Sequence, residues 1–400
     1  MSLLDVAPII EQMLLVSEKV SDLNFSANQK PQVEINGVLY PASPIGLGKL
    51  SPYQTETIAM SLMRDNPDAA AQLYKTRTAD LSYALPGKCR FRVNIFQQRN
   101  SYSIVMRVIP HEIPSFEGLG LPSVLAEVAE IRNGVVLLTG PTGSGKTSTL
   151  AAIIDRINET KAYHIVTIED PIEFLHSHKK STINQREVGA DTKDFASALR
   201  AALRQAPKVI LVGEMRDLET AEIALEAAET GHLVLSTLHT IDASKTIDRI
   251  IGLYPKNEER IIRTRLAQTF RFIVSQRLIP TSDGKGRVAA VEVLKSNPRT
   301  REYIERGETE GKSLLDAIRD GEIDGMQDFD SVILDLISRD KITKDDGLSF
   351  ATNKNNLLLQ LKGLSSTEDY ANAHRPKSMI QPMAPPPPVE NPDSVLNMIE

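Results

Sequence analysis

The 400-residue chain is poor in cysteine, with Cys89 as its single thiol. One cysteine excludes an intramolecular disulfide and favours a reducing compartment. Long hydrophobic runs are lacking too, since no uninterrupted apolar stretch reaches the length needed to cross a bilayer. Near the start, Asp5 and Glu11 stand where a secretory signal would carry basic residues. We therefore expect a cytoplasmic protein that does not insert into a membrane directly.

An excess of positive charge is also lacking. The chain has 46 Lys and Arg against 52 Asp and Glu, a formal net charge of −6 at pH 7. Without a clustered basic and aromatic stripe, nucleic acid is not an expected partner. Hydrophobic residues make up 41% of the sequence, enough for two domain cores in a chain of this length.

The strongest functional signal is residues 140–147, which read Gly-Pro-Thr-Gly-Ser-Gly-Lys-Thr. An apolar run at 134–139 precedes them and a helix-compatible segment at 148–157 follows, the context of a phosphate-binding loop. Backbone N–H groups of such a loop bind phosphate, while Lys146 reaches the β- and γ-phosphates of ATP and the Thr147 hydroxyl binds Mg²⁺. The predicted nucleotide-binding residues are Gly140, Pro141, Thr142, Gly143, Ser144, Gly145, Lys146, Thr147 and Ser148.

The first part of the chain, residues 1–110, reads as an α+β domain. Strands are expected at 22–26, 32–40 with a turn at Asn36-Gly37, 80–85, 89–97 and 102–109, and helices at 51–63 and 69–74. Proline and glycine then crowd together, which indicates a linker at 111–122.

The second part, residues 123–365, alternates short apolar strands with helices. The expected strands are 135–139, 164–168, 209–212 and 233–237, a pattern typical of a parallel sheet with its ligand at the carboxyl ends. After Arg249 mostly helices are expected, at 258–277, 299–306, 313–320 and 329–338, with a glycine-rich hairpin at 282–286. Few apolar residues and the run Pro385–Pro388 predict a disordered tail at 366–400.

Polar groups follow these strands. Glu169 is the expected catalytic base that accepts a proton from the attacking water, with Asp170 or Glu173 supporting metal hydration, although a solvated acidic turn would look the same in isolation. Glu214 ends an apolar run as in a Walker B motif, which predicts that it organises Mg²⁺ through water. His239 follows the strand at 233–237, where it would sense the γ-phosphate or contact a neighbouring subunit.

In this order the motifs resemble those of the type II secretion and type IV pilus ATPases, and within them the PilT and PilU group of pilus retraction ATPases. The resemblance covers roughly residues 15–363 and includes Gln185–Gly189, Gly213–Asp217, Ser275–Pro280 and Gly284–Glu292. The chain also lacks the tetracysteine insert of many extension and secretion ATPases. Residues 204–208 are closer to PilU, whereas 213–217 and 237–240 are closer to PilT, so the chain resembles a divergent paralogue of the two and is assigned to neither.

The resemblance implies an N-terminal PAS-like α+β domain and a C-terminal RecA-like P-loop NTPase domain with a helical C-terminal subdomain. It also implies a homohexamer at the cytoplasmic face of the inner membrane, with ATP and Mg²⁺ as cofactors. The expected partners are a pilus platform protein and a paralogous pilus ATPase. Arg92 and Arg107 match two family arginines that reach the nucleotide phosphates.

Three other functions remain open from the residues. The same enzyme would serve as a pilus extension or type II secretion ATPase. A nucleic-acid motor with a RecA-like domain is disfavoured by the acidic charge. A regulatory subunit without hydrolysis is disfavoured by the joint presence of Lys146, Glu169 and Glu214.

Overall fold

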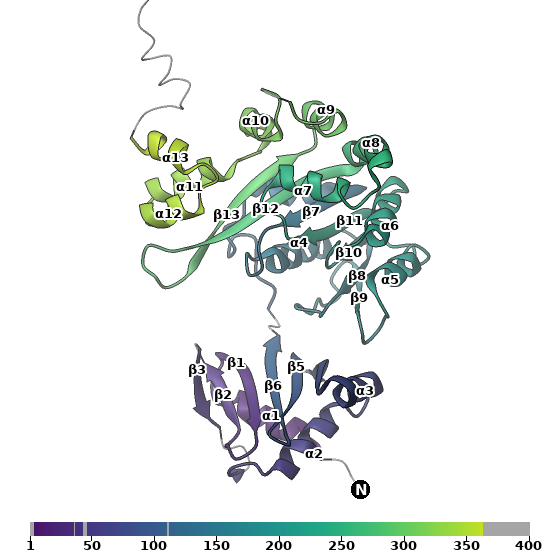
Figure 1. The fold of residues 1–400 in the computed structure, drawn as a ribbon, viewed down its shortest axis with the longest axis vertical. Coiled ribbons are helices and arrows are strands. Elements are labelled where there is room, and N and C mark those ends of the chain that lie inside the picture. The colour runs from purple at the N-terminus through teal and green to yellow at the C-terminus, as the bar shows by residue number, and fades with distance from the viewer. Residues whose placement is uncertain (1–3, 36, 43–45, 110–111, 310, 363–400) are drawn as a thin grey trace, which may run out of the picture. The chain divides into compact units, whose positions relative to one another are not determined.

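The computed structural model describes residues 4–362 apart from 36, 43–45, 110–111 and 310 (Figure 1). One compact unit spans Met1–Thr352, and a second begins at Asn353, where α13 (Lys354–Leu361) is described. The tail expected at 366–400 lies outside the described residues. No helix among the residues described is long and apolar enough to cross a membrane.

The N-terminal part of the first unit is an antiparallel sheet of six strands in the order β3-β2-β1-β6-β5-β4. Helix α2 packs on β6, α3 on β4, and α1 on β1 and β2, which closes one apolar core. The elements are α1 (Ala7–Leu14), β1 (Val20–Ser26), β2 (Gln32–Ile35), β3 (Val38–Pro41), α2 (Pro52–Leu62), α3 (Pro67–Thr76), β4 (Thr78–Leu85), β5 (Cys89–Gln98) and β6 (Ser101–Ile109).

Local signals explain where the helices of this part begin. The Ser51 hydroxyl accepts from the backbone of Gln54, whose side chain caps Ser51 in return, so α2 starts with a capping box. Asn66 caps α3, and Pro67 occupies its first position, where a missing N–H costs nothing. The strands and helices expected before residue 110 are therefore confirmed, except that Asn36 of the expected turn lies outside the described residues.

The second sheet has seven strands in the order β13-β12-β7-β11-β10-β8-β9. Every neighbouring pair is parallel except β12 with β13, which is an antiparallel hairpin at the edge. The strands are β7 (Gly134–Thr139), β8 (His164–Glu169), β9 (Thr182–Glu187), β10 (Val209–Val212), β11 (Leu233–Leu238), β12 (Phe270–Pro280) and β13 (Arg287–Lys295). The expected parallel sheet with crossover helices is thus present.

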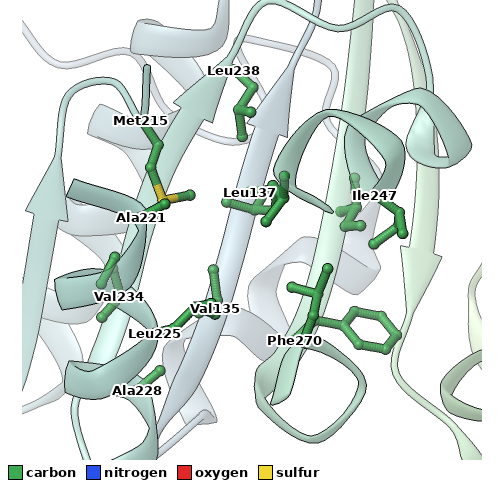
Figure 2. Packing of buried hydrophobic residues seen from close by; sticks show 14 of the residues in the cluster. Val135, Leu137, Met215, Ala221, Leu225, Ala228, Val234, Leu238, Ile247 and Phe270 are labelled. Atoms are coloured by element: carbon green, nitrogen blue, oxygen red, sulfur yellow. The ribbon is translucent and has the colours of Figure 1, made fainter. Parts of the chain in front are cut away.

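Helices cover this sheet on both faces because its central strands are apolar on both faces. Val136 and Leu138 of β7 pack with α4 in one core, whereas Val135 and Leu137 pack with α6 in the other. Figure 2 shows Val135 of β7 beside Leu225 of α6, with Leu137 further along the same strand. The helices are η2 (Ser123–Glu130), α4 (Lys146–Thr160), α5 (Phe195–Ala202), α6 (Leu218–Glu229), α7 (Ala243–Ile251), η3 (Lys256–Glu258) and α8 (Glu259–Thr269).

One expectation about the second half is wrong. The helix expected at 258–277 ends at Thr269, and Phe270–Pro280 form β12, which pairs with β7. Its Phe, Ile, Val and Leu residues suit a buried strand, and sheet pairing overrides the helical spacing seen in the sequence. Two strands, β12 and β13, therefore extend the sheet where mostly helix was expected, and the polar strand β9 was not foreseen.

Helices follow the hairpin. They are α9 (Pro298–Arg306), α10 (Leu314–Asp320), η4 (Glu322–Asp324), α11 (Phe329–Ser338) and α12 (Lys344–Phe350). The expected helices at 299–306, 313–320 and 329–338 are confirmed, and the glycine-rich turn at 282–286 joins β12 to β13.

Candidate nucleotide site

The phosphate loop joins the end of β7 to the start of α4, as the sequence predicted. Gly145 is the N-cap of α4 and has φ +90°, while Gly140 has φ +143°, both in the region that favours glycine. A Cβ on Gly140 would lie 2.4 Å from the Gln276 carbonyl oxygen. The glycines therefore permit both the curled backbone and a close approach of β12.

Lys146 is the first residue of α4, and only 8% of it is exposed. Its Nζ donates to the carbonyl oxygens of Gly140 at 2.8 Å and Pro141 at 3.1 Å. Burial lowers the pKa of Lys146, while the nearby carboxylates of Glu214 and Glu173 oppose that shift. The ammonium group is thus held inside the curl of the loop, where a phosphate would meet it.

A cleft of about 570 Å³ opens over this loop. It brings together the carboxyl ends of the central strands: the loop after β7, Glu169 of β8, Glu214 after β10, and Thr237 and His239 at the end of β11. Asp170 and Glu173 line the same cleft. His232 lies at the opposite end of β11, where its Nδ1 is 2.9 Å from the Ala227 carbonyl oxygen.

Glu169 sits at the end of β8 and is half-buried. Its Oε1 accepts from Thr167 Oγ1 at 2.6 Å and from Gln185 Nε2 at 3.1 Å. Burial raises the pKa of Glu169, and the hydrogen bonds from Thr167 and Gln185 oppose the rise. A carboxylate with a raised pKa beside a phosphate loop is a stronger base than an ordinary glutamate.

Glu214 has the opposite electrostatic environment. Its Oε2 lies 2.6 Å from Arg216 Nη2, and its Oε1 lies 3.4 Å from His239 Nε2. Burial would raise the pKa of Glu214, but the hydrogen bond from Arg216 and the charges of His239 and Arg216 bring it below its ordinary value. Glu214 therefore stays ionised at neutral pH.

Several residues that support this cleft were not predicted from the sequence. Gln276 of β12 accepts from Thr149 Oγ1 of α4 at 2.9 Å and lies against Gly140 and Gly145. Gln185 of β9 joins Glu169 to the segment after it, since it also donates to the Phe174 carbonyl at 2.8 Å. Leu278 and Arg287 of the β12–β13 hairpin line the cleft as well. In the sequence, these residues were marked only by their positions within the family motifs, which do not indicate what they contact.

Arg92 and Arg107 lie opposite each other on β5 and β6, so both are on one face of an antiparallel hairpin. Both line the cleft that holds the phosphate loop. The Arg107 Nε donates to Asp22 Oδ1 of β1 at 3.1 Å. The role predicted for these guanidinium groups stays a prediction.

Comparison with known proteins identifies the family. The profile of the type II/IV secretion system protein family matches residues 77–315. The chain is 42% identical to the type IV pilus retraction ATPase PilT of Pseudomonas aeruginosa over 84% of this chain and 96% of that protein. It is 38% identical to the type IV pilus ATPase PilU of the same organism, over 90% and 93%. The chain belongs to the type II/IV secretion system protein family.

Solved structures agree with this assignment. The crystal structure of the pilus retraction motor PilT with bound ADP matches with a TM-score of 0.79 and 42% identity, covering 88% of this chain and 98% of that one. The ATPase DotB of Legionella pneumophila matches with a TM-score of 0.73 and 28% identity. The chain is therefore a P-loop ATPase of the PilT/PilU type with a mixed α/β fold, and it binds nucleotide.

Proposed function

We propose that this protein is a motor that hydrolyses ATP to ADP and phosphate to drive type IV pilus retraction, and with it twitching motility. The observation that carries the proposal is 42% identity to the retraction ATPase PilT over nearly the whole of that protein, joined to an intact phosphate loop. In this assignment the N-terminal sheet is the PAS-like domain, residues 1–110, and residues 123–365 are the RecA-like domain with its C-terminal helices.

In the proposed reaction the loop N–H groups and Lys146 hold the β- and γ-phosphates. A water oxygen attacks the γ-phosphorus, its proton passes to Glu169, and the bond to the β-phosphate oxygen breaks to release ADP. The raised pKa of Glu169 supports this role, because a base that titrates nearer neutral pH accepts a proton more readily.

Mg²⁺ fits the same cleft. Thr147 and Glu214 both line it, a hydroxyl and an ionised carboxylate being donors that Mg²⁺ prefers. We assign Thr147 as a direct ligand and Glu214 as a ligand through water. Mg²⁺ would neutralise charge that develops on the phosphate oxygens. Within the part of the chain that the structure describes, no group of three or more His, Cys, Asp or Glu side chains could hold a metal ion, so the phosphates would complete the coordination.

The mechanical step is assigned to Arg92 and Arg107. Because both line the phosphate cleft from the N-terminal sheet, a γ-phosphate would bridge them to Lys146, and its loss would remove that bridge. His239 would respond to the same change through its contact with Glu214. The expected partners are a pilus platform protein at the cytoplasmic face of the inner membrane and a paralogous pilus ATPase.

A deletion strain tests the direction of the work. Loss of a retraction motor leaves surface pili in excess and abolishes twitching, whereas loss of an extension motor leaves no pili. Complementation with the wild-type gene should restore twitching, and complementation with Lys146→Ala should not. A deletion strain without surface pili would indicate an extension motor and not a retraction motor. Unchanged pili and twitching would exclude any role in the pilus system.

We also propose a homohexamer in which the N-terminal part of one subunit contacts the ATPase part of the next, a head-to-tail arrangement that closes. Mass measurement in solution with ATP and Mg²⁺ should give six subunits, and the specific activity should rise with protein concentration. Monomers with full activity at all concentrations would contradict the ring.

A further inference from the structure

A buried carboxylate outside the phosphate cleft lies where the C-terminal hairpin meets α7. Glu292 is on β13 directly opposite Ser275 of β12, and only 3% of it is exposed. Its Oε1 accepts from the backbone N–H of Ala243 at 2.9 Å and from Ser275 Oγ at 3.1 Å. Glu292 thus joins β13, β12 and α7. Burial of a carboxylate costs free energy, so these hydrogen bonds must compensate for it.

The N–H group that Glu292 accepts belongs to the first residue of α7. A carboxylate at a helix N-terminus meets the positive end of the helix dipole and a donor that has no partner within the helix. Asp242, the N-cap of α7, accepts from the Lys245 N–H at 2.7 Å. Helix α7 is therefore fixed at its first turn by one carboxylate from within and one from β13.

The segment before α7 carries His239. Leu238 is the last residue of β11 and Ala243 the first of α7, so four residues lie between two anchored points. Thr240 Oγ1 lies 2.6 Å from Thr246 Oγ1 of α7, which ties the segment to the helix. His239 itself lies 3.4 Å from Glu214 Oε1 in the nucleotide cleft. The segment that carries His239 is therefore held between β11 and the anchored first turn of α7.

Burial raises the pKa of Glu292 to about 7. The Ala243 N–H lowers this pKa, the Asp242 charge raises it, and the Ser275 hydroxyl and the Arg277 charge lower it. Among the described residues, Asp242 and Arg277 are the charged groups that act on it. Arg277 lies over the Phe329 ring of α11 at 3.7 Å, donates to the Phe350 carbonyl of α12, and is near Asp330. Glu292 therefore changes charge within the physiological range.

We propose that Glu292 is a positioning residue of this ATPase, which holds the α7 N-terminus and through it His239 against Glu214 when its carboxylate is ionised. A charged acceptor at a helix N-terminus holds the N–H more strongly than a protonated acid does. Turnover should then rise as Glu292 loses its proton. The inference rests on the proposed ATP hydrolysis and not on the direction of pilus work.

The test compares full-length wild type, Glu292→Gln and Ser275→Ala by steady-state ATP turnover from about one unit below to about one unit above the pKa of Glu292. Glu292→Gln should lower kcat at the alkaline end on the order of fivefold, with KM for ATP unchanged. Ser275→Ala removes a hydrogen-bond donor to the carboxylate, so the pH midpoint of its turnover profile should lie higher than that of the wild type. Asp248→Asn, at an exposed position on α7, is the matched control and should change neither kcat nor the pH midpoint of turnover.

The decisive comparison is the double variant. Ser275→Ala should shift the pH midpoint when Glu292 is present and should have no effect on the midpoint in the Glu292→Gln background. A shift of equal size in both backgrounds, or no shift in either, would overturn the proposal, since the titration would then belong to a group other than Glu292. Absence of ATP turnover in the wild type itself would instead refute the proposed ATP hydrolysis.

Thermal unfolding separates positioning from folding. Because the pKa of Glu292 is raised in the folded state, its stability contribution is present at low pH and is lost as pH rises through about 7. Glu292→Gln carries no such charge and should unfold at a temperature no lower than wild type at alkaline pH. A lower unfolding temperature with a parallel loss of activity at every pH would make Glu292 a structural residue only.

Discussion

At the scale of single residues, the pKa values of two glutamates in one cleft are shifted in opposite directions. The pKa of Glu169 is raised because its carboxylate is buried, and that of Glu214 is lowered because Arg216 and His239 face it. Two acids whose environments separate their pKa values can divide the work of a base and a permanent anion. This division is why Glu169 is assigned to the proton and Glu214 to the metal.

Glu169→Gln should retain ATP binding and lose turnover on the order of 10²-fold or more, since an amide accepts no proton from water. In the wild type, turnover should fall on acidification at a higher pH than for an ordinary glutamate, because the base form is lost as pH falls through a raised pKa. Phosphate release and ATP titration measure the two effects. A Glu169→Gln enzyme with wild-type turnover, beside an inactive Glu214→Gln enzyme, would move the base to Glu214.

At the scale of elements, β12 is the support of the phosphate loop and of the groups behind it. Gln276 faces the loop and α4, whereas the neighbouring Ser275 faces Glu292 and α7, because successive strand residues point to opposite faces. One strand therefore fixes both the phosphate-binding backbone and the segment that carries His239.

Substitution of the loop glycines tests whether contact with β12 supports nucleotide binding. Gly140→Ala would place a Cβ 2.4 Å from the Gln276 backbone oxygen, so either the loop or β12 must shift. ADP affinity should fall on the order of tenfold or more. Gly143→Ala is the matched control, since it shares a positive φ but meets nothing within 4 Å. Titration with a fluorescent ADP measures both, and equal losses would mean that backbone strain, not the contact with β12, is responsible.

At the scale of the whole molecule, the nucleotide cleft is lined from two sheets. Arg92 and Arg107 come from the N-terminal sheet, and the phosphate loop comes from the seven-stranded one. An ATPase whose cleft needs both can convert the loss of a phosphate into relative movement of the parts that carry them.

Arg92→Ala and Arg107→Ala should each lower ATP turnover roughly 10- to 100-fold, the equivalent of about 1.5–3 kcal/mol for a hydrogen bond from a charged group. Arg99→Ala, in the turn between β5 and β6, is the control and should leave turnover unchanged. Asp22→Asn tests the restraint on Arg107 by removing its ion pair. Wild-type turnover in both cleft variants would exclude the N-terminal arginines from the mechanism.

Much of this architecture was predictable because it depends on neighbours along the chain. The loop at 140–147 and its flanking strand and helix follow from glycine spacing and apolar runs, and α2 and α3 begin at their capping residues. The acids at the ends of β8 and β10 were predictable for the same reason. Parallel strands bring their carboxyl ends to one edge, so their order in the sequence was enough to place them together.

Residues that act through distant partners were not predictable. The segment 270–277 has helical spacing, yet it is a strand because it pairs with β7, more than 130 residues earlier in the chain. Gln185, Gln276 and Glu292 carry ordinary polar side chains, and their contacts with Glu169, the phosphate loop and α7 arise from packing between elements. The pKa values of Glu169 and Glu214 likewise depend on burial and on facing charges. Local spacing determines the nucleotide motif, whereas long-range pairing decides which side chains surround it and how they titrate.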